Sequence, residues 1–441
     1  MSSLSSLITP SDSGYDAARL AFDLSDQRPA AISLASTVAE VQDALRYARD
    51  NGLKVANQAT GHAAIALPSL ENALLLKPAI DTEPVIDATE GFARVGAGTR
   101  WGPVVEAAGE HGLAAMHGSS PTVGVVGYLL GGGLSFYSRR YGLACNRVRA
   151  IEVVTADGEV GRVDRDNEPD LFWALRGGGG LFATVTAIEL DLLPIREIFG
   201  GISFWPVELA ESALSIWLDW TRAAPDSITT SYRIMNLPPF ETVPEPIRGR
   251  NLVAIDGIAV DQADGEALMN LLADLGDPVM GFWGPMPAPG ASAIHGDPQE
   301  PVPAMGNSTL LDEVEDELIG ALVEAAGGES GNSLIATELR QLGGALRRQD
   351  DSGGVAGRID GEFVAFGVGL AVNPEAKAKT EEDLARIFAA LDPWQSGRQF
   401  YNFAIAGATL DSCFSGDAIE ALKAIQHEYD PDRLFLAPIT F

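Results

Sequence analysis

The residues with the clearest chemical potential follow a predicted strand near the start of the chain, in the segment Asn57-Gln-Ala-Thr-Gly-His62. Successive small residues let neighbouring backbone N–H groups turn toward one point and form an anion-binding nest, which suits a diphosphate. His62 follows a glycine, so its ring is unhindered. A lone histidine is more often an ordinary surface or core residue. The chain's five histidines include no i, i+4 pair typical of a helical zinc site, and no metal site is predicted.

A second informative segment is the glycine-rich run from Gly118 to Leu134. Glycine lets the backbone pass close to a bulky group or adopt a positive φ. Dense glycine beside apolar residues therefore suits a flat cofactor lying against backbone N–H groups, although the run is equally consistent with a flexible loop. It is not the G-x-G-x-x-G fingerprint of a βαβ unit.

A third segment, Asp170 to Thr186, places four glycines before an apolar β segment. No Lys-Ser or Lys-Thr pair follows these glycines, so the segment is not a P-loop. The chain also lacks a G-x-S-x-G nucleophile elbow.

Taken together, these segments resemble the berberine-bridge-enzyme-like branch of the FAD-linked oxidases, whose fold is that of vanillyl-alcohol oxidase and p-cresol methylhydroxylase (the PCMH type). The match depends on many short pieces in a conserved order rather than on any one of them. The matching pieces are Gly14-Tyr-Asp, Thr60-Gly-His62, Val95-Gly-Ala-Gly98, Pro121-Thr-Val-Gly, Leu130-Gly-Gly-Gly, Tyr141-Gly-Leu143, Val154-Thr-Ala-Asp-Gly158, Asp170 to Gly180, His295-Gly-Asp-Pro298, Glu338 to Ala345, Asn402-Phe403 and Tyr429-Asp-Pro431.

The resemblance implies that FAD lies between an N-terminal domain, completed by the C-terminal tail, and a substrate domain whose sheet covers the isoalloxazine. It also implies that His62 occupies the position of the 8α-histidyl flavin link. The residues expected to bind FAD are Asn57, Gln58, Ala59, Thr60, Gly61, His62, Ala63, Ser119, Ser120, Thr122, Val123, Gly124, Gly127, Tyr128, Gly131, Gly132, Gly133, Leu143, Val185 and Asn402.

The sequence departs from the family pattern at several positions. Many relatives carry a second flavin link through a cysteine where this chain has Ser120, and serine cannot form that thioether, so a single covalent bond through His62 is expected. The usual asparagine after the four glycines is Leu181. The family's tyrosine is replaced by Phe400, with Tyr401 beside it, which puts the family's acid–base chemistry in doubt here.

The resemblance implies an FAD-dependent oxidoreductase that moves a hydride from a small organic substrate, such as an alcohol, sugar, amine or phenolic metabolite, to flavin N5. Val123 occupies a position that gates oxygen in relatives, and valine there favours an oxidase using O2. Candidate catalytic residues are Tyr401, Glu338 and His295, and candidate substrate-binding residues are Arg340 and Gln341. Because strand residues alternate between faces, Glu338, Arg340 and Gln341 cannot all face the flavin.

Three alternatives stay open at this point. The first is a dehydrogenase of the same fold with another electron acceptor. The second is a flavoprotein that catalyses a non-redox cyclisation, and the third is a binding module without a cofactor.

The elements around these residues indicate an α+β chain of two domains. Residues 30–56 read as strand, helix and strand, with Val38, Val41, Leu45 and Ala48 at helical spacing. Helices are expected at 101–111, 208–222, 263–275 and 417–427, strands at 148–157, 184–193 and 363–372, and a long loop at 280–308. The domains are predicted at residues 1–196 (PCMH-type FAD-binding), 197–396 (an antiparallel sheet covered by helices) and 397–441, a segment that returns to the FAD domain.

Composition narrows the possible partners. With 30 basic and 61 acidic residues the formal charge is −31, which argues against nucleic-acid and anionic-membrane binding. The family resemblance implies a small-molecule substrate and O2 as partners. The two cysteines are too few for a disulfide framework, and no signal peptide is recognised, so a cytoplasmic location is expected. The oligomeric state is not predicted.

Overall fold

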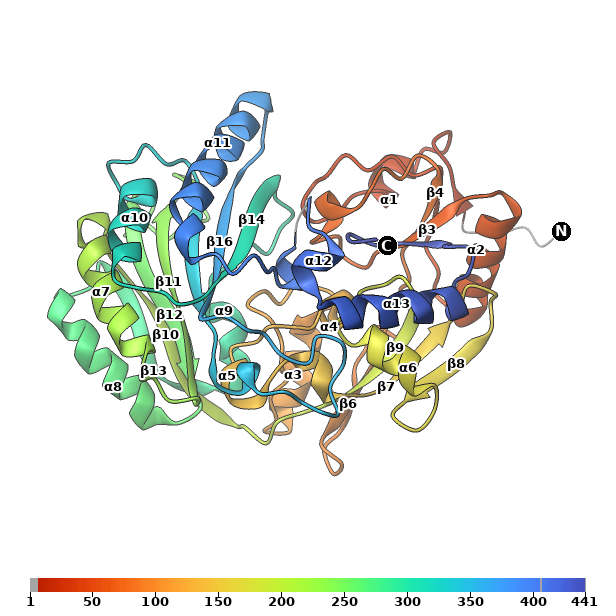
Figure 1. The fold of residues 1–441 in the computed structure, drawn as a ribbon, viewed down its shortest axis with the longest axis horizontal. Helices are drawn as coiled ribbons and strands as arrows, with labels where there is room; N and C mark the ends of the chain where they lie inside the picture. The colour runs from red at the N-terminus through yellow and green to blue at the C-terminus, as the bar shows by residue number, and fades with distance from the viewer. Residues whose placement is uncertain (1–6, 405–406, 441) are drawn as a thin grey trace.

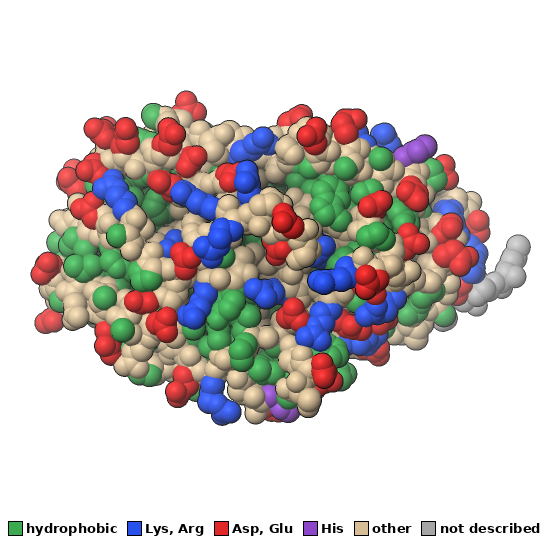
Figure 2. All heavy atoms as spheres, turned by 60° about the horizontal axis from the view of Figure 1, so that its bottom comes forward, with side chains coloured by type: hydrophobic (Ala, Val, Ile, Leu, Met, Phe, Trp, Pro, Cys, Tyr) green, Lys and Arg blue, Asp and Glu red, His purple; other side chains and the backbone are tan. Residues whose placement is uncertain are grey.

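The computed structural model describes residues 7–404 and 407–440. The chain forms three β-sheets with helices around them, and the predicted α+β class is confirmed (Figure 1). No helix in the described part of the chain is both long and apolar enough to span a membrane. On the face shown in Figure 2, acidic side chains are scattered over both halves of the molecule with Lys and Arg side chains between them.

The first sheet has the strand order β1-β2-β4-β3-β17 and is parallel except for β1. Its last strand comes from the C-terminal tail, where Phe435 pairs with Val55 and Leu436 with Ala56 of β3. The C-terminal tail therefore stabilises β3, the strand that leads directly into the 57–62 loop. The strands are β1 (Leu7–Ile8), β2 (Ala31–Ser33), β3 (Lys54–Asn57), β4 (Ala73–Leu76) and β17 (Phe435–Leu436).

Helix α2 (Val38–Asp50) packs on this first sheet as its apolar spacing predicts. Thr37 caps it by accepting a hydrogen bond from the backbone of Glu40. Its buried residues, Val41, Ala44, Leu45 and Ala48, form one stripe along the helix.

The second sheet is antiparallel, with the order β5-β6-β9-β7-β8. Its strands are β5 (Val85–Asp87), β6 (Phe92–Gly96), β7 (Val148–Val154), β8 (Val160–Asp164) and β9 (Thr184–Asp191). The other helices around the first two sheets are α1 (Tyr15–Ala18), α3 (Trp101–Glu110), α4 (Val125–Leu130), α5 (Ser138–Tyr141), α6 (Pro169–Leu175), α12 (Leu410–Cys413) and α13 (Gly416–Tyr429), of which α1 packs on the first sheet.

The third sheet has seven antiparallel strands in the order β13-β10-β12-β11-β15-β16-β14. One face is covered by helices and the other faces the rest of the molecule (Figure 1). The strands are β10 (Glu197–Pro206), β11 (Ile228–Asn236), β12 (Asn251–Ala259), β13 (Met280–Pro287), β14 (Ala304–Leu311), β15 (Ala336–Gln341) and β16 (Phe363–Leu370). The helices are α7 (Ala210–Thr221), α8 (Gln262–Leu272), α9 (Ala291–Ile294), α10 (Glu317–Ala326) and α11 (Pro374–Ala390). The domain limits stay predictions.

The expected long loop at 280–308 is wrong. Residues 280–287 form β13, which pairs with β10 along its whole length, and β14 begins at residue 304. The proline content of this segment, which includes Pro285 and Pro287, led to the prediction of a loop. Because β13 is an edge strand, only one row of its backbone groups is needed for pairing, and such strands tolerate proline.

Candidate active site

The predicted anion-binding loop lies at the end of β3, and His62 is fixed there by three neighbours. Its Nδ1 lies 2.8 Å from Thr60 Oγ1, its Nε2 lies 3.1 Å from Thr122 Oγ1, and its ring stacks on Phe22 at 3.9 Å. Burial lowers the pKa of His62 to about 4. The imidazole is therefore neutral at pH 7, and one ring nitrogen keeps a free lone pair.

The loop before α4 meets the 57–62 loop at this histidine. Ser120 Oγ lies 2.8 Å from Thr122 Oγ1, which in turn contacts His62. Gly124 precedes α4, and a Cβ there would lie only 3.0 Å from the Cβ of Ala59. The structure thus brings His62 and Ser120 into one hydrogen-bonded group.

The elements around these loops hold several buried polar atoms that suit a polar cofactor. Asn57 accepts a hydrogen bond from Thr184 Oγ1 at 2.9 Å, but its amide nitrogen has no partner in the described structure. The side-chain amide of Gln58, the hydroxyl of Tyr128 and the hydroxyl of Thr186 are also buried and unpaired there. Buried polar groups are nearly always hydrogen-bonded. These atoms fit a ligand such as FAD, which carries many donors and acceptors.

Asn402 of the C-terminal tail is hydrogen-bonded to the segment that contains the triple glycine, residues 131–133. It accepts a hydrogen bond from the backbone N–H of Gly133 at 2.7 Å and donates one to the carbonyl of Tyr128 at 3.0 Å. A Cβ at Gly131 would lie 2.3 Å from the Asn402 amide nitrogen, so any side chain there would displace the Asn402 amide. The tail therefore holds the shape of this loop.

Other predicted cofactor residues occupy varied surroundings. Leu143 and Val185 are buried in apolar clusters, and Val123 is half-buried against the apolar core next to α3. Gly127 has no atom within 4 Å of an added Cβ, so no protein contact requires glycine at that position.

A cluster of ionisable side chains lies on the third sheet, on the face opposite α7, α8, α10 and α11. Glu338 Oε1 lies 2.7 Å from Arg340 Nε on β15, and Glu338 Oε2 lies 3.6 Å from Nε2 of His295, which follows α9. Nδ1 of His295 lies 3.0 Å from Asp256 on β12, and Arg233 on β11 pairs with the same carboxylate.

These five side chains are buried, so their charges interact strongly. Burial and Arg233 would lower the pKa of His295, but Asp256, Glu338 and Asp297 outweigh them and raise it to about 9. Burial would raise the pKa of Glu338, but Arg340 and His295 hold it well below its usual range. At pH 7 the cluster therefore contains an imidazolium and an ionised Glu338.

The remaining two predicted residues lie elsewhere. Gln341 accepts a hydrogen bond from Thr230, which also binds Trp217 of α7, so its side chain belongs to the helix-covered face. Tyr401 is half-buried beside the ring of Phe414, and its hydroxyl lies against Gly179. Neither side chain joins the cluster around Glu338.

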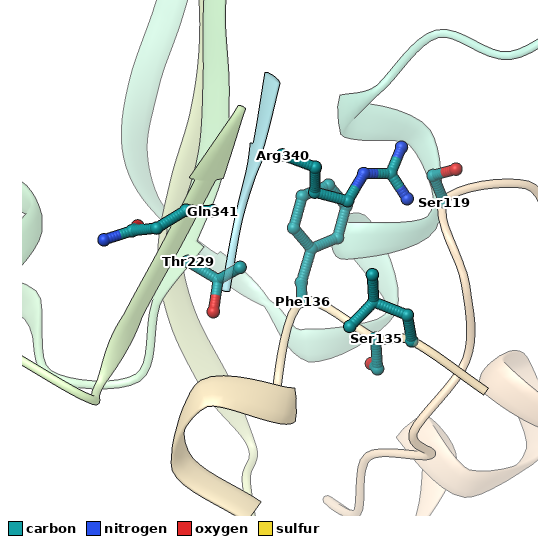
Figure 3. Close-up of a pocket in the computed structure, with 7 residues that line it drawn as sticks. Ser119, Ser135, Phe136, Thr229, Arg340 and Gln341 are labelled. Carbon is teal, nitrogen blue, oxygen red and sulfur yellow. The ribbon is translucent and has the colours of Figure 1, made fainter. Parts of the chain in front are cut away.

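A small cavity joins the charged sheet face to the loop before α4. In Figure 3, Arg340 extends toward Ser119 while Gln341 points the opposite way. The Arg340 guanidinium also lies 5.3 Å from the ring centre of Phe403. The lining residues are Ser119, Leu134, Ser135, Phe136, Thr229, Arg340 and Gln341.

A larger cavity of about 540 Å³ opens beside the histidine loop. It lies between residues 23–28, residues 64–71 and the start of β14, with Ala371 and Lys377 at its edge. This volume is sufficient for a small organic molecule.

Three functional candidates were missed from the sequence, namely Arg233, Asp256 and Asp297. A signal was present for two of them, because Asp256 and Arg233 each interrupt an otherwise uncharged strand. Asp297 stands in the matched piece His295-Gly-Asp-Pro298 but was not considered for a role.

Comparison with known proteins agrees with this geometry. Residues 29–164 match the FAD binding domain family. The chain is 30% identical to (R)-6-hydroxynicotine oxidase of Paenarthrobacter nicotinovorans over 445 aligned residues, covering 90% of this chain and 96% of that protein. A FAD-dependent monooxygenase of Fusarium proliferatum is 37% identical, but only over 41% of this chain and 35% of its own length.

Solved structures show the same fold. The crystal structure of 6-hydroxy-D-nicotine oxidase from Arthrobacter nicotinovorans superposes with a TM-score of 0.81 at 24% identity, covering 97% of this chain and 96% of that one. Berberine bridge enzyme from Eschscholzia californica gives 0.78 at 18% identity, covering 93% and 89%. Glucooligosaccharide oxidase from Acremonium strictum, described with a 6-S-cysteinyl, 8α-N1-histidyl FAD, gives 0.77 at 21% identity, covering 97% and 95%.

Proposed function

The chain belongs to the berberine-bridge-enzyme-like family of FAD-dependent oxidoreductases, and from this premise we propose that it is an oxidase of a small hydroxyl- or amine-bearing substrate, with O2 as the electron acceptor. The observation that carries the proposal is the buried group of Glu338, Arg340 and His295, which faces the loop before α4 across a small cavity. FAD, when bound, supplies a hydride acceptor at N5 and passes the electrons to O2 to give hydrogen peroxide.

We infer that FAD is held by the 57–62 loop, by the loop before α4 and by Asn402 through the triple glycine. His62 would carry the covalent link, because its ring is half-buried, neutral and held by Thr60 and Thr122. Ser120 stands where a cysteine would make a second link, so we propose one covalent bond.

The residues proposed to act on the substrate are Glu338 and Arg340. The Glu338 carboxylate would take the proton from a substrate hydroxyl or amine as the hydride leaves the adjacent carbon. A carboxylate of low pKa suffices, because loss of the hydride makes that O–H or N–H proton strongly acidic. Arg340 would orient the substrate, since its guanidinium reaches the cavity between Ser119 and Phe136.

His295 keeps Glu338 ordered, since its Nε2 lies 3.6 Å from the Glu338 carboxylate. The positions of Gln341 and Tyr401 give them no part in the proposed chemistry.

The test uses the purified holoenzyme under nitrogen and then under air. The probes are (R)- and (S)-6-hydroxynicotine, a glucose oligosaccharide and simple secondary alcohols. Bleaching of the flavin absorbance by one probe, followed by peroxide release in air, is the expected result. Bleaching without peroxide would instead indicate a dehydrogenase. A protein purified without FAD would contradict the proposal altogether.

A further inference from the structure

The Asp297 carboxylate contacts both the loop before α4 and the charged cluster on the third sheet. Its Oδ2 accepts a hydrogen bond from Ser119 Oγ at 2.7 Å, and its Oδ1 lies 4.0 Å from His295 Nε2. Asp297 follows Gly296, whose φ of +73° turns the chain directly after His295. That turn brings the aspartate back toward the histidine ring.

On one side, Asp297 contacts the loop proposed to bind FAD. Its partner Ser119 is the chain neighbour of Ser120, which is hydrogen-bonded to Thr122, and Thr122 contacts His62. A short series of contacts thus links the Asp297 carboxylate to the proposed flavin tether.

On the other side, Asp297 completes the charge balance around His295. The histidine is faced by Asp256 of β12, Arg233 of β11, Glu338 and Arg340 of β15, and Asp297. With His295 protonated, the three cations Arg233, Arg340 and His295 balance three carboxylates. The side chain of Asp297 is 28% exposed, whereas those of Asp256 and Glu338 are 0% and 2% exposed. Asp297 is therefore the carboxylate of this group whose removal costs least in buried packing.

We propose that Asp297 is a positioning residue that couples the charged cluster to the flavin: its carboxylate faces His295 together with those of Asp256 and Glu338, and its hydrogen bond to Ser119 holds the cofactor loop against the sheet. This inference rests on the proposed function, because it assumes that FAD lies beside this loop. It assigns a role to a residue that does not itself contact the reacting atoms.

Two variants separate the charge from the hydrogen bond. Asp297→Asn removes the charge but keeps an oxygen that can accept from Ser119. Ser119→Ala removes the hydrogen bond and leaves the carboxylate in place. Each is purified as holoenzyme with its covalent FAD content measured, and a thermal melt confirms that it is folded.

The first readout is the pKa of His295, obtained from the pH titration of ¹³C-labelled histidine ring signals between pH 5 and 10, with His295→Gln used for assignment. The second is the flavin midpoint potential, measured by reduction with dye equilibration, which needs no substrate. Asp297→Asn should lower the pKa of His295 and raise the midpoint potential, because a negative charge that opposes flavin reduction is lost. Ser119→Ala should leave the pKa of His295 in place.

The inference is overturned if Asp297→Asn leaves the flavin midpoint potential unchanged, whether or not it changes the pKa of His295. It is also overturned if Ser119→Ala lowers the pKa of His295 as far as Asp297→Asn does. These failures are distinguishable from failure of the proposed function. In the latter case the wild-type protein itself would contain no FAD, or its flavin would not be reduced by any substrate.

Discussion

The Nε2 atom of His62 lies 3.1 Å from Oγ1 of Thr122, so two loops that stand 60 residues apart in the sequence meet at the imidazole. Thr122 is in turn hydrogen-bonded to Ser120. The proposed attachment point and the position that carries a second link in many relatives are therefore parts of one local structure.

We predict that His62→Ala abolishes covalent attachment of FAD. The wild-type chain, denatured and examined by mass spectrometry, should show an added mass equal to FAD, and the variant should not. His111→Ala is the matched control, since it removes an exposed histidine at the end of α3 and should leave the added mass in place. An unmodified wild-type chain would refute the assignment.

Ser120→Cys should create a second attachment point beside His62. In the double variant His62→Ala, Ser120→Cys, part of the FAD should then stay bound after denaturation, because the new thiol lies in the hydrogen-bonded group that contains position 62. In-gel flavin fluorescence and mass spectrometry check this. Complete loss of FAD from the double variant would show that Ser120 is not close enough to the flavin ring.

Glu338→Gln should slow flavin reduction by substrate about 10² to 10⁴-fold, the usual range for loss of a general base. Stopped-flow absorbance under nitrogen measures this step without O2. Tyr401→Phe is the control, because Tyr401 packs in the core beside Phe414 and not against Glu338. Equal rate losses in the two variants would contradict the assignment of the base.

Val123→Leu should reduce the rate at which the reduced enzyme reacts with O2 while leaving its reduction by substrate almost unchanged. The half-buried valine adjoins the loop proposed to hold the flavin, and the larger side chain leaves less room for oxygen. Mixing the reduced enzyme with aerated buffer measures the oxidation rate. An unchanged rate would show that position 123 has only a packing role.

The stability of the protein should fall between pH 6.5 and pH 9 because of His295. The folded-state pKa of about 9 exceeds the ordinary value of 6.5, so the protonated histidine stabilises the fold fully below pH 6.5 and ever less as the pH approaches 9. At 1.36 kcal/mol per pKa unit, the effect is on the order of 3 kcal/mol.

Denaturant unfolding of the holoenzyme at pH 6 and pH 9 measures this difference. The His295→Gln variant should show a smaller pH dependence, although it is less stable at both values. If both proteins lose the same stability between pH 6 and pH 9, the histidine is not the group responsible.

Local sequence determined a large part of this protein. The apolar spacing of 38–48 specified α2, because an amphipathic helix needs only neighbouring residues to define its buried face. The segments 57–62 and 118–133 were recognisable because a cofactor loop needs small residues at particular places, and such requirements are visible in the chain itself. The same order of motifs predicted the family and FAD.

Only the tertiary structure decided which of these residues meet. Strand alternation showed that Glu338, Arg340 and Gln341 could not share a face, but the packing of α7 on the sheet determined that Gln341 turns toward Trp217. The roles of Asp256 and Asp297 depend on contacts with strands and loops distant in sequence, and an isolated aspartate carries no local sign of such partners. The charge of His295 was also undetermined, because a histidine's ionisation depends on the carboxylates that the fold places around it.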